Sequence, residues 1–495
     1  MKFSVKKGSL AEVKSDLVVV NLFEDVVTPG GATGSVDELL NNMISNFVIK
    51  KEKFNGKYGK MYLLPVANCE NFSKVLIVGL GKFEEFSLNK IRELSSKVIQ
   101  KCNSLKNIKT VTSVLHGGGI AGWDAFDCAQ MMAEGTLIGN YNFDKYKSEK
   151  EKPEVEEFII VEINDNQYEK ASKGVKKGKL MAEAVNFARN LSNEPAMFAT
   201  PSELARVALE SEGVNVEVYD KEEIEAFGMR AFLAVGQGSS QPPKFIHMKY
   251  TCDKPKKKIA IIGKGVTFDS GGLDLKPPAS MLNMKDDMSA SAAIISIMHF
   301  ISKFKPHIEV HGLVAACENM PGSNAYKPGD VLTAKNGKTI EVDNTDAEGR
   351  ITLADVITYA EEELKVDEII DMATLTGACM VALGSAASAI MGNDQKMIDK
   401  MIKCGAKAGE NLWQLPLYEE YKESLKSDIA DMKNTGSRYG GASVAAAFLQ
   451  NFILKKTPWV HMDIAGTAYL EKCNKLGIKA ATGVGVRTLI NYIME

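Results

Sequence analysis

The sequence predicts a two-domain α/β protein: a smaller N-terminal α/β domain and a larger C-terminal α/β domain whose mostly parallel or mixed central sheet is flanked by helices. The chain has 495 residues, more than one hydrophobic core usually organises. Short β-branched runs alternate with helical stretches along its length, as in α/β folds. The composition, with 45% hydrophobic and 25% charged residues, is typical of folded globular proteins.

The first third of the chain carries the pattern of the smaller domain. Strands are predicted at 16–21, 74–79 and 110–115, and a helix at 89–101. Glycines at 78–81 and 117–122 lack the full dinucleotide-binding fingerprint. We therefore expect tight turns there rather than a nucleotide site.

A charged stretch at 148–157 marks the end of this region. A strand at 158–163 and a long helical pattern from about residue 170 to 191 follow it. Domain boundaries fall in such polar segments. We place the N-terminal domain at 1–165, a connecting helix at 166–195 and the C-terminal domain at 196–495.

The C-terminal domain shows apolar strands and long helices in turn. Strands are predicted at 258–263, 309–316 and 367–373, and helices at 289–304 and 351–364. Continuous apolar strands are typical of a buried parallel or mixed sheet. A mostly apolar stretch at 378–392 fits either core or a contact surface.

Charge and composition exclude several classes of function. A net charge of −3 gives no reason to expect a nucleic-acid partner. The only apolar run near the N-terminus, 17–20, is too short for a signal peptide or a membrane span. The eight cysteines have no CxxC spacing, which fits reduced thiols in a cytoplasmic protein.

Candidate functional residues begin after the strand predicted at 258–263. No two of the six histidines have the spacing of a zinc-binding pair. Segment 263–272 (GKGVTFDSGG) instead places Lys264 and Asp269 at the carboxyl edge of the sheet, where open α/β folds bind ligands. Lys276 follows, and two prolines stiffen the chain directly after it.

Two further acidic segments precede predicted helices. Asp286 and Asp287 precede the helix at 289–304, so they fit either an N-cap or a metal site. In the segment NTDAEGR at 344–350, an extended chain would point Asp346, Glu348 and Arg350 to one face. A solvated helix entry is the alternative for this second segment.

Four carboxylates, from Asp269, Asp287, Asp346 and Glu348, carry the charge that neutralises two divalent cations. Two metals about 3.5–4 Å apart activate a bridging water and polarise a carbonyl. Such a pair suits hydrolysis of a peptide bond, and it suits phosphoester hydrolysis as the alternative reaction.

Three basic residues complete the candidate site. Lys264 can bind metal only when neutral, so adjacent cations would have to depress its pKa far below about 10.4. Lys276 and Arg350 would stay charged, and they would stabilise an oxyanion or hold an anion that accepts the proton.

These segments resemble the leucyl (cytosol) aminopeptidases, a family of di-metal exopeptidases. Besides GKGVTFDSGG and NTDAEGR, the similar segments are ENMP at 318–321, KPGDV at 327–331, ATLTGA at 373–378, LPL at 415–417, HMDIAG at 461–466 and ATGVGVR at 481–487. The resemblance covers 186–495, whereas residues 1–165 resemble the family only in size and α/β character. It implies that residues 196–495 form the catalytic domain of an aminopeptidase that releases N-terminal residues, preferably leucine or other apolar ones, from peptides.

The resemblance also implies roles for individual residues. One metal would be bound by Lys264, Asp269, Asp287 and Glu348, and the other by Asp269, Asp346 and Glu348. The resemblance thus selects Asp287 over Asp286 as the metal ligand. Lys276 and Arg350 match the catalytic pair, with a bicarbonate near Arg350. The pocket for the first side chain would be shaped by Met284, Leu375, Thr376, Gly377, Ala465 and Ala468.

The family implies Mn²⁺ or Zn²⁺, with Mg²⁺ or Co²⁺ as alternatives, and a cytoplasmic homohexamer of two trimers. A different class of function is a DNA-binding or regulatory protein that keeps the fold, against which the complete ligand set argues. The sequence departs from the family at Ser289 to Ser291, where we expect a tighter helix start, and at Asp274, which adds an acid.

Overall fold

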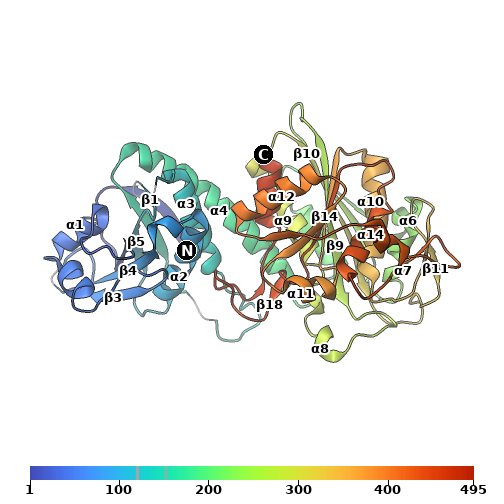
Figure 1. Cartoon of the computed structure of the whole chain (residues 1–495), viewed down its shortest axis with the longest axis horizontal. Helices are drawn as coiled ribbons and strands as arrows, with labels where there is room; N and C mark the ends of the chain where they lie inside the picture. The colour runs from blue at the N-terminus through green and yellow to red at the C-terminus, as the bar shows by residue number, and fades with distance from the viewer. Residues whose placement is uncertain (68, 119–121, 151–152) are drawn as a thin grey trace. The chain divides into compact units, whose positions relative to one another are not determined.

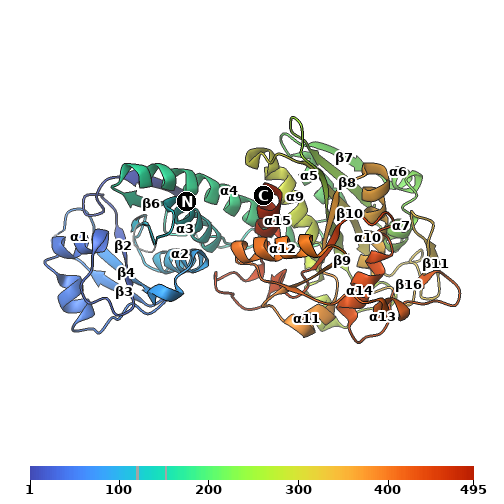
Figure 2. The ribbon, with the colours of Figure 1, turned by 45° about the horizontal axis from the view of Figure 1, so that its top comes forward.

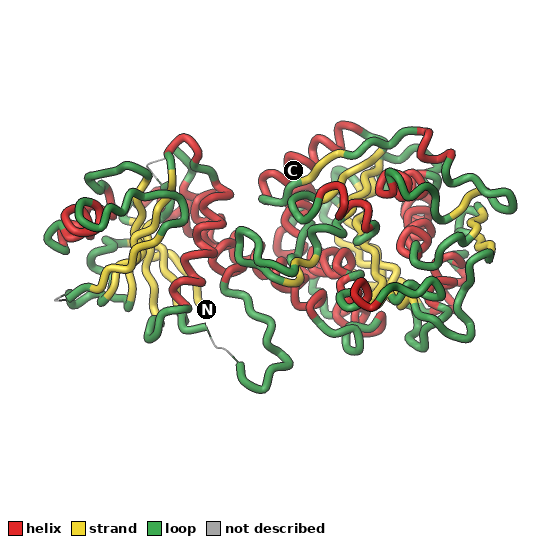
Figure 3. Tube along the Cα trace, turned by 60° about the horizontal axis from the view of Figure 1, so that its bottom comes forward, coloured by secondary structure: helices red, strands yellow, loops and turns green. Residues whose placement is uncertain are grey.

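The computed structural model describes residues 1–67, 69–118, 122–150 and 153–495. The chain forms two compact units: unit 1 comprises Met1–Glu183 with Cys473–Ile478, and unit 2 comprises Ala184–Lys472 with Lys479–Glu495. In each unit the strands run through the middle and the helices lie outside them (Figure 3). The predicted fold, a smaller N-terminal and a larger C-terminal α/β part, is confirmed (Figure 1).

Unit 1 is built on a six-stranded sheet with the order β1-β6-β5-β2-β4-β3. Its strands are β1 (Lys2–Lys7), β2 (Leu17–Phe23), β3 (Met61–Pro65), β4 (Lys74–Gly81), β5 (Thr110–Val114) and β6 (Glu157–Glu162). Neighbouring strands are parallel except β3 and β4. Along β2, Leu17 and Val19 pack into one hydrophobic core and Val18 and Val20 into another, so the sheet is covered on both faces.

The helical segments of unit 1 are α1 (Gly31–Leu39), η1 (Ile44–Ile49), η2 (Phe83–Glu85), α2 (Leu88–Asn103) and α3 (Ala125–Gly139), and α4 (Asp165–Asn193) continues into unit 2. Helices α2 and α3 pack closely, because Gly135 has no Cβ: that atom would lie 2.0 Å from the carbonyl oxygen of Arg92. The buried Arg92 guanidinium donates to Glu134 of α3 at 2.8 Å. The predicted turn at 117–122 and charged stretch at 148–157 lie partly outside the described residues.

Unit 2 is built on an eight-stranded mixed sheet with the order β15-β14-β17-β13-β9-β10-β8-β7. The strands are β7 (Asn215–Tyr219), β8 (Lys244–Tyr250), β9 (Lys258–Asp269), β10 (Glu309–Asn319), β13 (Glu368–Ala373), β14 (Ser388–Gly392), β15 (Leu412–Gln414) and β17 (Trp459–Asp463). The four central strands β17, β13, β9 and β10 are parallel. Their carboxyl ends therefore meet at one edge of the sheet, where ligands bind in open α/β folds.

Helices cover both faces of this sheet. In Figure 2, α9 (Ser289–Phe304) and α15 (Val486–Met494) lie on one face, and α10 (Glu348–Tyr359) and α14 (Gly441–Gln450) lie on the other. The remaining helical segments are α5 (Pro201–Leu209), α6 (Lys221–Ala226), α7 (Arg230–Gly236), α8 (Pro278–Met281), η3 (Met284–Asp286), η4 (Ala360–Leu364), α11 (Gly377–Leu383), α12 (Gln395–Ala408) and α13 (Glu419–Glu423). Short strands β11 (Val331–Thr333), β12 (Thr339–Glu341) and β16 (Met432–Lys433) form one small sheet, and β18 (Tyr469–Leu470) and β19 (Ala480–Ala481) another.

Two predicted boundaries near the candidate site are wrong. The strand predicted to end at 263 continues to Asp269, because its parallel pairing with β10 persists as far as Asn319. Lys264 therefore lies inside a strand rather than after its end. The helix predicted from 351 begins at Glu348, so the acidic segment before it is shorter than predicted.

Some features that the sequence left open are resolved. The stretch 378–392 divides into two parts: helix α11 exposes Met380 and Val381, whereas most of β14 is buried. The cysteines carry free thiols, and Cys473 is the exposed one among them. Within the described residues, no helix combines the length and apolar character that a bilayer crossing requires.

Candidate metal centre

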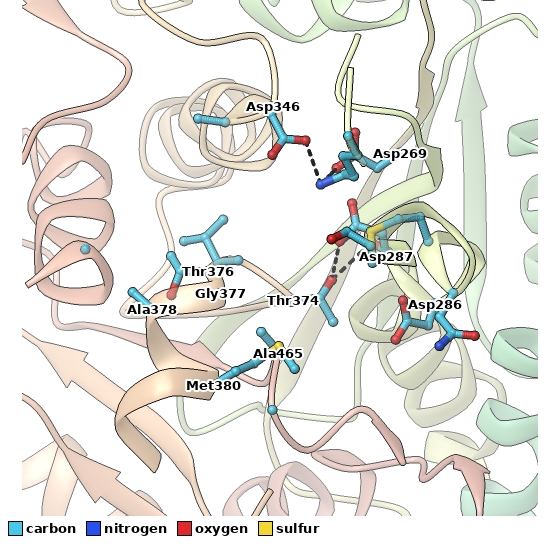
Figure 4. Close-up of a pocket in the computed structure, with 18 of the residues that line it drawn as sticks. Asp269, Asp286, Asp287, Asp346, Thr374, Thr376, Gly377, Ala378, Met380 and Ala465 are labelled. Atoms are coloured by element: carbon cyan, nitrogen blue, oxygen red, sulfur yellow. Dashed lines mark hydrogen bonds and ion pairs between the residues drawn. The ribbon is translucent and has the colours of Figure 1, made fainter. Parts of the chain in front are cut away.

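An acidic cleft lies at the carboxyl edge of the central sheet of unit 2, and its volume is about 1100 Å³. Figure 4 shows labelled side chains from several segments facing it. Asp269 comes from the end of β9, Asp287 from the turn after η3, and Asp346 from the turn before α10. The loops after β13 and β17 supply Thr376 and Ala465.

Asp269 is held firmly at the end of β9. Its side chain is buried, and its Oδ1 accepts hydrogen bonds from the Gly271 amide at 2.9 Å and from the Asn319 side chain at 2.8 Å. Gly271 and Gly272 have φ values of 89° and 67°, which favour glycine. This turn brings Lys276 back, so that its Nζ lies 2.9 Å from Asp269 Oδ2 and 2.6 Å from Asp346 Oδ1.

Lys264 joins two other carboxylates. Its buried Nζ lies 2.8 Å from Asp287 Oδ2 and 2.7 Å from Glu348 Oε1. Gly349 makes this placement possible, because a Cβ at that position would lie 2.6 Å from Lys264 Cε. A side chain at residue 349 would therefore displace the lysine.

The two interpretations of Asp286 and Asp287 can now be compared. Met288 is the N-cap residue of α9, and no side chain caps this helix. Asp287 instead accepts from the Thr374 hydroxyl at 2.7 Å and faces Lys264. The start of α9 lies close to β9, because a Cβ on Gly263 would lie 2.8 Å from Ser291 Cα.

The geometry predicted for the segment 344–350 is only partly right. Glu348 and Arg350 belong to the first turn of α10, whereas the prediction placed them on an extended chain. Asp346 lies in the preceding turn, with its amide donating to Asn344 Oδ1 at 2.7 Å. Arg350 is buried and donates to the Asn434 carbonyl at 2.9 Å.

The carboxylates fit a metal site. Carboxylate oxygens of Asp269, Asp346 and Glu348 all lie within 4.8 Å of one another. Within the described part of the chain, Asp287 Oδ2, Asp346 Oδ1 and Glu348 Oε1 are buried and accept no hydrogen bond of normal geometry. Their close neighbours are the ammonium groups of Lys264 and Lys276. Hard oxygen donors of this kind suit divalent cations.

Burial shapes the electrostatics of the cluster. It raises the pKa of the Asp287 and Glu348 carboxyl groups, because the charged form loses hydration. Burial by itself would lower the pKa of Lys264, but the carboxylates of Asp287 and Glu348 outweigh it and raise that pKa. Burial lowers the pKa of Arg350 to about 10, so this residue remains charged at neutral pH.

Five of the six residues predicted for the pocket line the cleft: Met284, Leu375, Thr376, Gly377 and Ala465. Ala468 is not among the described residues of the lining. It is buried, and its carbonyl accepts from the Thr482 amide at 2.9 Å.

The sequence interpretation missed several residues of this site. Thr374 binds Asp287 through its hydroxyl, and its carbonyl accepts from Lys264 at 3.1 Å. Asn319 supports Asp269, and the carboxylate of Asp463 accepts from Thr376. All three lie inside segments that resemble the aminopeptidases, so the motifs pointed to them without indicating a role.

Buried carboxylates together with lysine and arginine side chains, at the carboxyl edge of an α/β sheet, are typical of a metal-dependent hydrolase. Two family models match the chain: "Cytosol aminopeptidase family, catalytic domain" over residues 186–490 and "Cytosol aminopeptidase family, N-terminal domain" over residues 19–150. The chain belongs to the cytosol aminopeptidase family.

Relatives across their full length agree with this assignment. A probable cytosol aminopeptidase of Persephonella marina is 42% identical, with 100% of both chains covered. One from Aquifex aeolicus is 45% identical over 90% of each chain.

Solved structures share the fold of the whole chain. A mutant of tomato leucine aminopeptidase has a TM-score of 0.88 and 32% identity, covering 100% of this chain and 96% of that one. The bottromycin maturation enzyme BotP in complex with Mn has a TM-score of 0.85 and 30% identity, covering 97% of this chain and 99% of that one. The chain is a metal-dependent aminopeptidase, a hydrolase that acts on peptides.

Proposed function

We propose that the protein holds two divalent cations and uses them to release N-terminal residues from peptides. Lys264, Asp269, Asp287 and Glu348 would bind one cation, and Asp269, Asp346 and Glu348 the other. The observation that supports this most strongly is the cluster of Asp269, Asp346 and Glu348, whose carboxylate oxygens lie within 4.8 Å of one another. Within the described residues, buried oxygens of Asp346, Glu348 and the nearby Asp287 accept no hydrogen bond of normal geometry. When bound, the cations supply a water of lowered pKa and polarise the scissile carbonyl.

Lys276 would stabilise the negative charge that develops on the carbonyl oxygen. Burial alone lowers its pKa, but the neighbouring Asp269 carboxylate, with other acids of the cluster, raises it above the ordinary value. Lys276 therefore stays protonated at neutral pH and can donate hydrogen bonds to an oxyanion. Its side chain also borders the cleft, where a substrate would be bound.

Arg350 would hold the anion that accepts the proton of the attacking water, and we propose bicarbonate in this role. Its guanidinium uses Nη1 to bind the Asn434 carbonyl, whereas its buried Nε has no hydrogen-bond partner in the described chain. A buried, charged donor without a partner favours binding of an anion.

The cleft is suited to an apolar first side chain, and we propose leucine or another apolar residue as the preferred one. Its walls include Met284, Leu375, Gly377, Met380 and Ala465. Such side chains bind hydrocarbon groups by removing them from water. The α-amino group of a peptide would lie on the acidic side of the same cleft.

Hydrolysis of leucine p-nitroanilide tests the proposal. We expect activity that a chelator removes and that Mn²⁺ or Zn²⁺ restores. The variants Glu348→Ala and Lys276→Ala should each lower kcat at least about 100-fold, as loss of a group that stabilises charge in the transition state does. Undiminished turnover in the presence of a chelator would refute the metal mechanism.

A matched control is Glu361→Gln, which alters a buried carboxylate outside the cleft. Glu361 accepts hydrogen bonds from Leu454, Lys455 and Thr457, so its loss should affect stability rather than turnover. An aryl phosphate serves as the second substrate, because two-metal sites also hydrolyse phosphoesters. Faster turnover of the phosphate than of the anilide would refute peptidase activity as the main function.

Further properties follow from family membership and are proposals for this chain. We propose Mn²⁺ or Zn²⁺ as the native metal, with Mg²⁺ or Co²⁺ as alternatives, a cytoplasmic location and a homohexamer. Residues 196–495 would form the catalytic domain, joined by a connecting helix at 166–195 to an N-terminal domain at 1–165. Sedimentation analysis of the purified protein measures the number of copies directly.

A further inference from the structure

Asp463 is a buried carboxylate outside the candidate metal ligands and the catalytic pair, although its charge, like that of Glu348, opposes the lowering of the Arg350 pKa by burial. It ends β17 and is 0% exposed. Its Oδ1 accepts from the Leu375 amide at 3.2 Å and from the Ala465 amide at 3.1 Å. Its Oδ2 accepts from the Thr376 hydroxyl at 2.7 Å.

These three donors belong to two separate walls of the cleft. Leu375 and Thr376 follow β13, whereas Ala465 follows β17, and all three line the cleft. Asp463 is not among the described lining residues. It therefore joins two walls from behind without facing the substrate.

The two walls also approach each other closely at a second point. A Cβ on Gly466 would lie 2.1 Å from the Gly384 carbonyl oxygen, and both residues line the cleft. Close packing at Gly466 fixes the two walls at one point. At Asp463 their separation is set by hydrogen bonds: one carboxylate oxygen accepts from the backbone amides of Leu375 and Ala465, and the other accepts from the Thr376 hydroxyl.

The hydroxyl of Thr376 uses its single proton to bind Asp463. It donates to Asp463 and accepts from the Cys379 amide at 3.0 Å, which caps helix α11. The hydroxyl is therefore occupied by two protein partners. Thr376 affects the cleft through the position of its backbone, which Asp463 and the helix cap determine together.

We infer that Asp463 is a positioning residue that sets the width of the pocket for the first side chain and thereby the selectivity for that side chain. The inference rests on the proposed aminopeptidase function. A pocket discriminates between hydrocarbon side chains through the fit of its walls, and a difference of one methylene is worth about 10–200-fold. A pocket whose wall can shift discriminates less well between such side chains.

The substitution Asp463→Asn tests the hydrogen bonds between Asp463 and the two walls with almost no change in side-chain size. An amide keeps one oxygen, which can serve the two backbone amides, but it turns an NH₂ group toward the Thr376 hydroxyl. That hydroxyl already accepts a bond and would lose its acceptor. Thr376→Val removes the same hydrogen bond from the other side.

The matched control is Asp355→Asn. Asp355 is also a buried carboxylate that accepts from backbone amides, those of Phe232 at 2.9 Å and Lys335 at 2.8 Å. It lies on α10 and is not among the described residues of the cleft. Its substitution measures the effect of a lost buried carboxylate without any effect on the pocket walls.

Two readouts are taken with the metal-loaded full chain: kcat/KM for leucine and alanine p-nitroanilides, and the dissociation constants of free leucine and alanine by calorimetry. We expect Asp463→Asn and Thr376→Val to lower the leucine-to-alanine ratio at least about fivefold in both readouts, a part of the discrimination that such a pocket gives. The change should appear mainly in KM. Asp355→Asn should keep the ratio of the unaltered protein.

An unchanged ratio in Asp463→Asn, or an equal change in Asp355→Asn, would overturn the inference. If the unaltered protein hydrolysed neither anilide, the proposed function would fail by itself. The calorimetric ratio would then still decide the role of Asp463.

Discussion

Asn319 connects two of the acidic segments that form the cleft. Its buried Nδ2 donates to Asp269 Oδ1 at 2.8 Å and to the Thr345 carbonyl at 3.0 Å, directly before Asp346. Thr345 is bound in turn by Asp274, whose Oδ2 accepts from its amide at 2.7 Å. The acid that departs from the family pattern therefore supports the loop that carries Asp346.

Substituting Asn319 by leucine should weaken metal binding. The variant keeps a similar side-chain size but removes both hydrogen bonds, so Asp269 and Asp346 lose their common support. Groups that orient metal ligands typically contribute about 10–100-fold to metal affinity, and we expect a loss in that range from a competition titration with a metal-binding dye. Thr358→Val, a buried change within α10 and away from the cleft, should leave the affinity unaltered.

A second buried polar cluster affects stability rather than catalysis. His247 Nε2 lies 2.8 Å from His311 Nδ1, and His311 Nε2 lies 2.9 Å from Glu309. Glu217 and Lys249 lie at the edge of the cluster. Burial lowers the pKa of His247 to about 4, with the neighbouring His311 contributing in the same direction.

This shift predicts an acid-sensitive stability. The unfolded chain binds a proton at His247 below a pKa of about 6.5, whereas the folded chain does so only near pH 4. Stability should therefore decrease as the pH falls below about 6.5, by about 2 kcal/mol between pH 7.5 and pH 5 from this residue. Urea unfolding of the chelated protein at both pH values measures the loss. His247→Gln should show a smaller decrease, and an equal decrease in both proteins would contradict the assignment.

The sequence identifies residues of the site better than it identifies their supports. Asp269, Asp346 and Arg350 stand in segments with several polar residues at short spacing, so a pattern was available. Asn319 and Asp463 are the last residues of strands β10 and β17. Their partners lie 50 and 87 positions away in the chain, and only the pairing of the strands brings them together.

At the scale of single elements, helix packing depends on glycines that a sequence pattern treats as unfavourable. Gly135 lies in the interior of α3, where glycine normally costs about 1 kcal/mol relative to alanine. The Cβ of an alanine there would lie 2.0 Å from the Arg92 carbonyl oxygen of α2. Backbone atoms cannot move aside as a side chain can.

Gly135→Ala should therefore destabilise unit 1, although alanine is the better helix former. We expect a loss of roughly 1–3 kcal/mol, typical of overpacking in a core, in urea unfolding. Gly236→Ala in α7 is the control, because its Cβ would meet its nearest neighbour at an ordinary 3.4 Å. Equal stability of both variants would show that α2 and α3 can separate without cost.

The elements themselves were predictable where a single pattern dominates. Helix α9 has the predicted bounds, Ser289–Phe304, because apolar and small residues dominate its sequence. Strand β9 was predicted to end at 263, whereas it continues to Asp269. Two glycines of this strand allow close approach: a Cβ on Gly263 would meet Ser291, and one on Gly265 would lie 2.8 Å from the Ala315 carbonyl oxygen.

At the scale of the whole molecule, three hydrophobic cores of the described residues each lie within one unit. The cores of unit 1 contain residues up to Val175, whereas the core around β9 and α10 begins at Ile224. The candidate metal residues all belong to unit 2. Binding of metal to the folded state should thus stabilise unit 2 alone.

Calorimetric unfolding should show two transitions, of which one responds to metal. At a free Mn²⁺ concentration 100 times the dissociation constant, we expect about 2.7 kcal/mol of added stability for unit 2. Scans with a chelator and with Mn²⁺ measure the shift, and Asp346→Asn should lose it. A single transition, or an equal shift of both, would contradict independent units.

The lysines of the cleft also bear on the order of events in the life of the protein. Lys264 and Lys276 each place an ammonium group between two carboxylates, so two positive charges offset part of the negative charge of the cluster before any cation binds. A newly made chain should therefore be able to fold when metal is scarce and to bind metal afterwards. If Lys264 then becomes a ligand, it must give up a proton, and each molecule that acquires metal should acidify an unbuffered solution measurably.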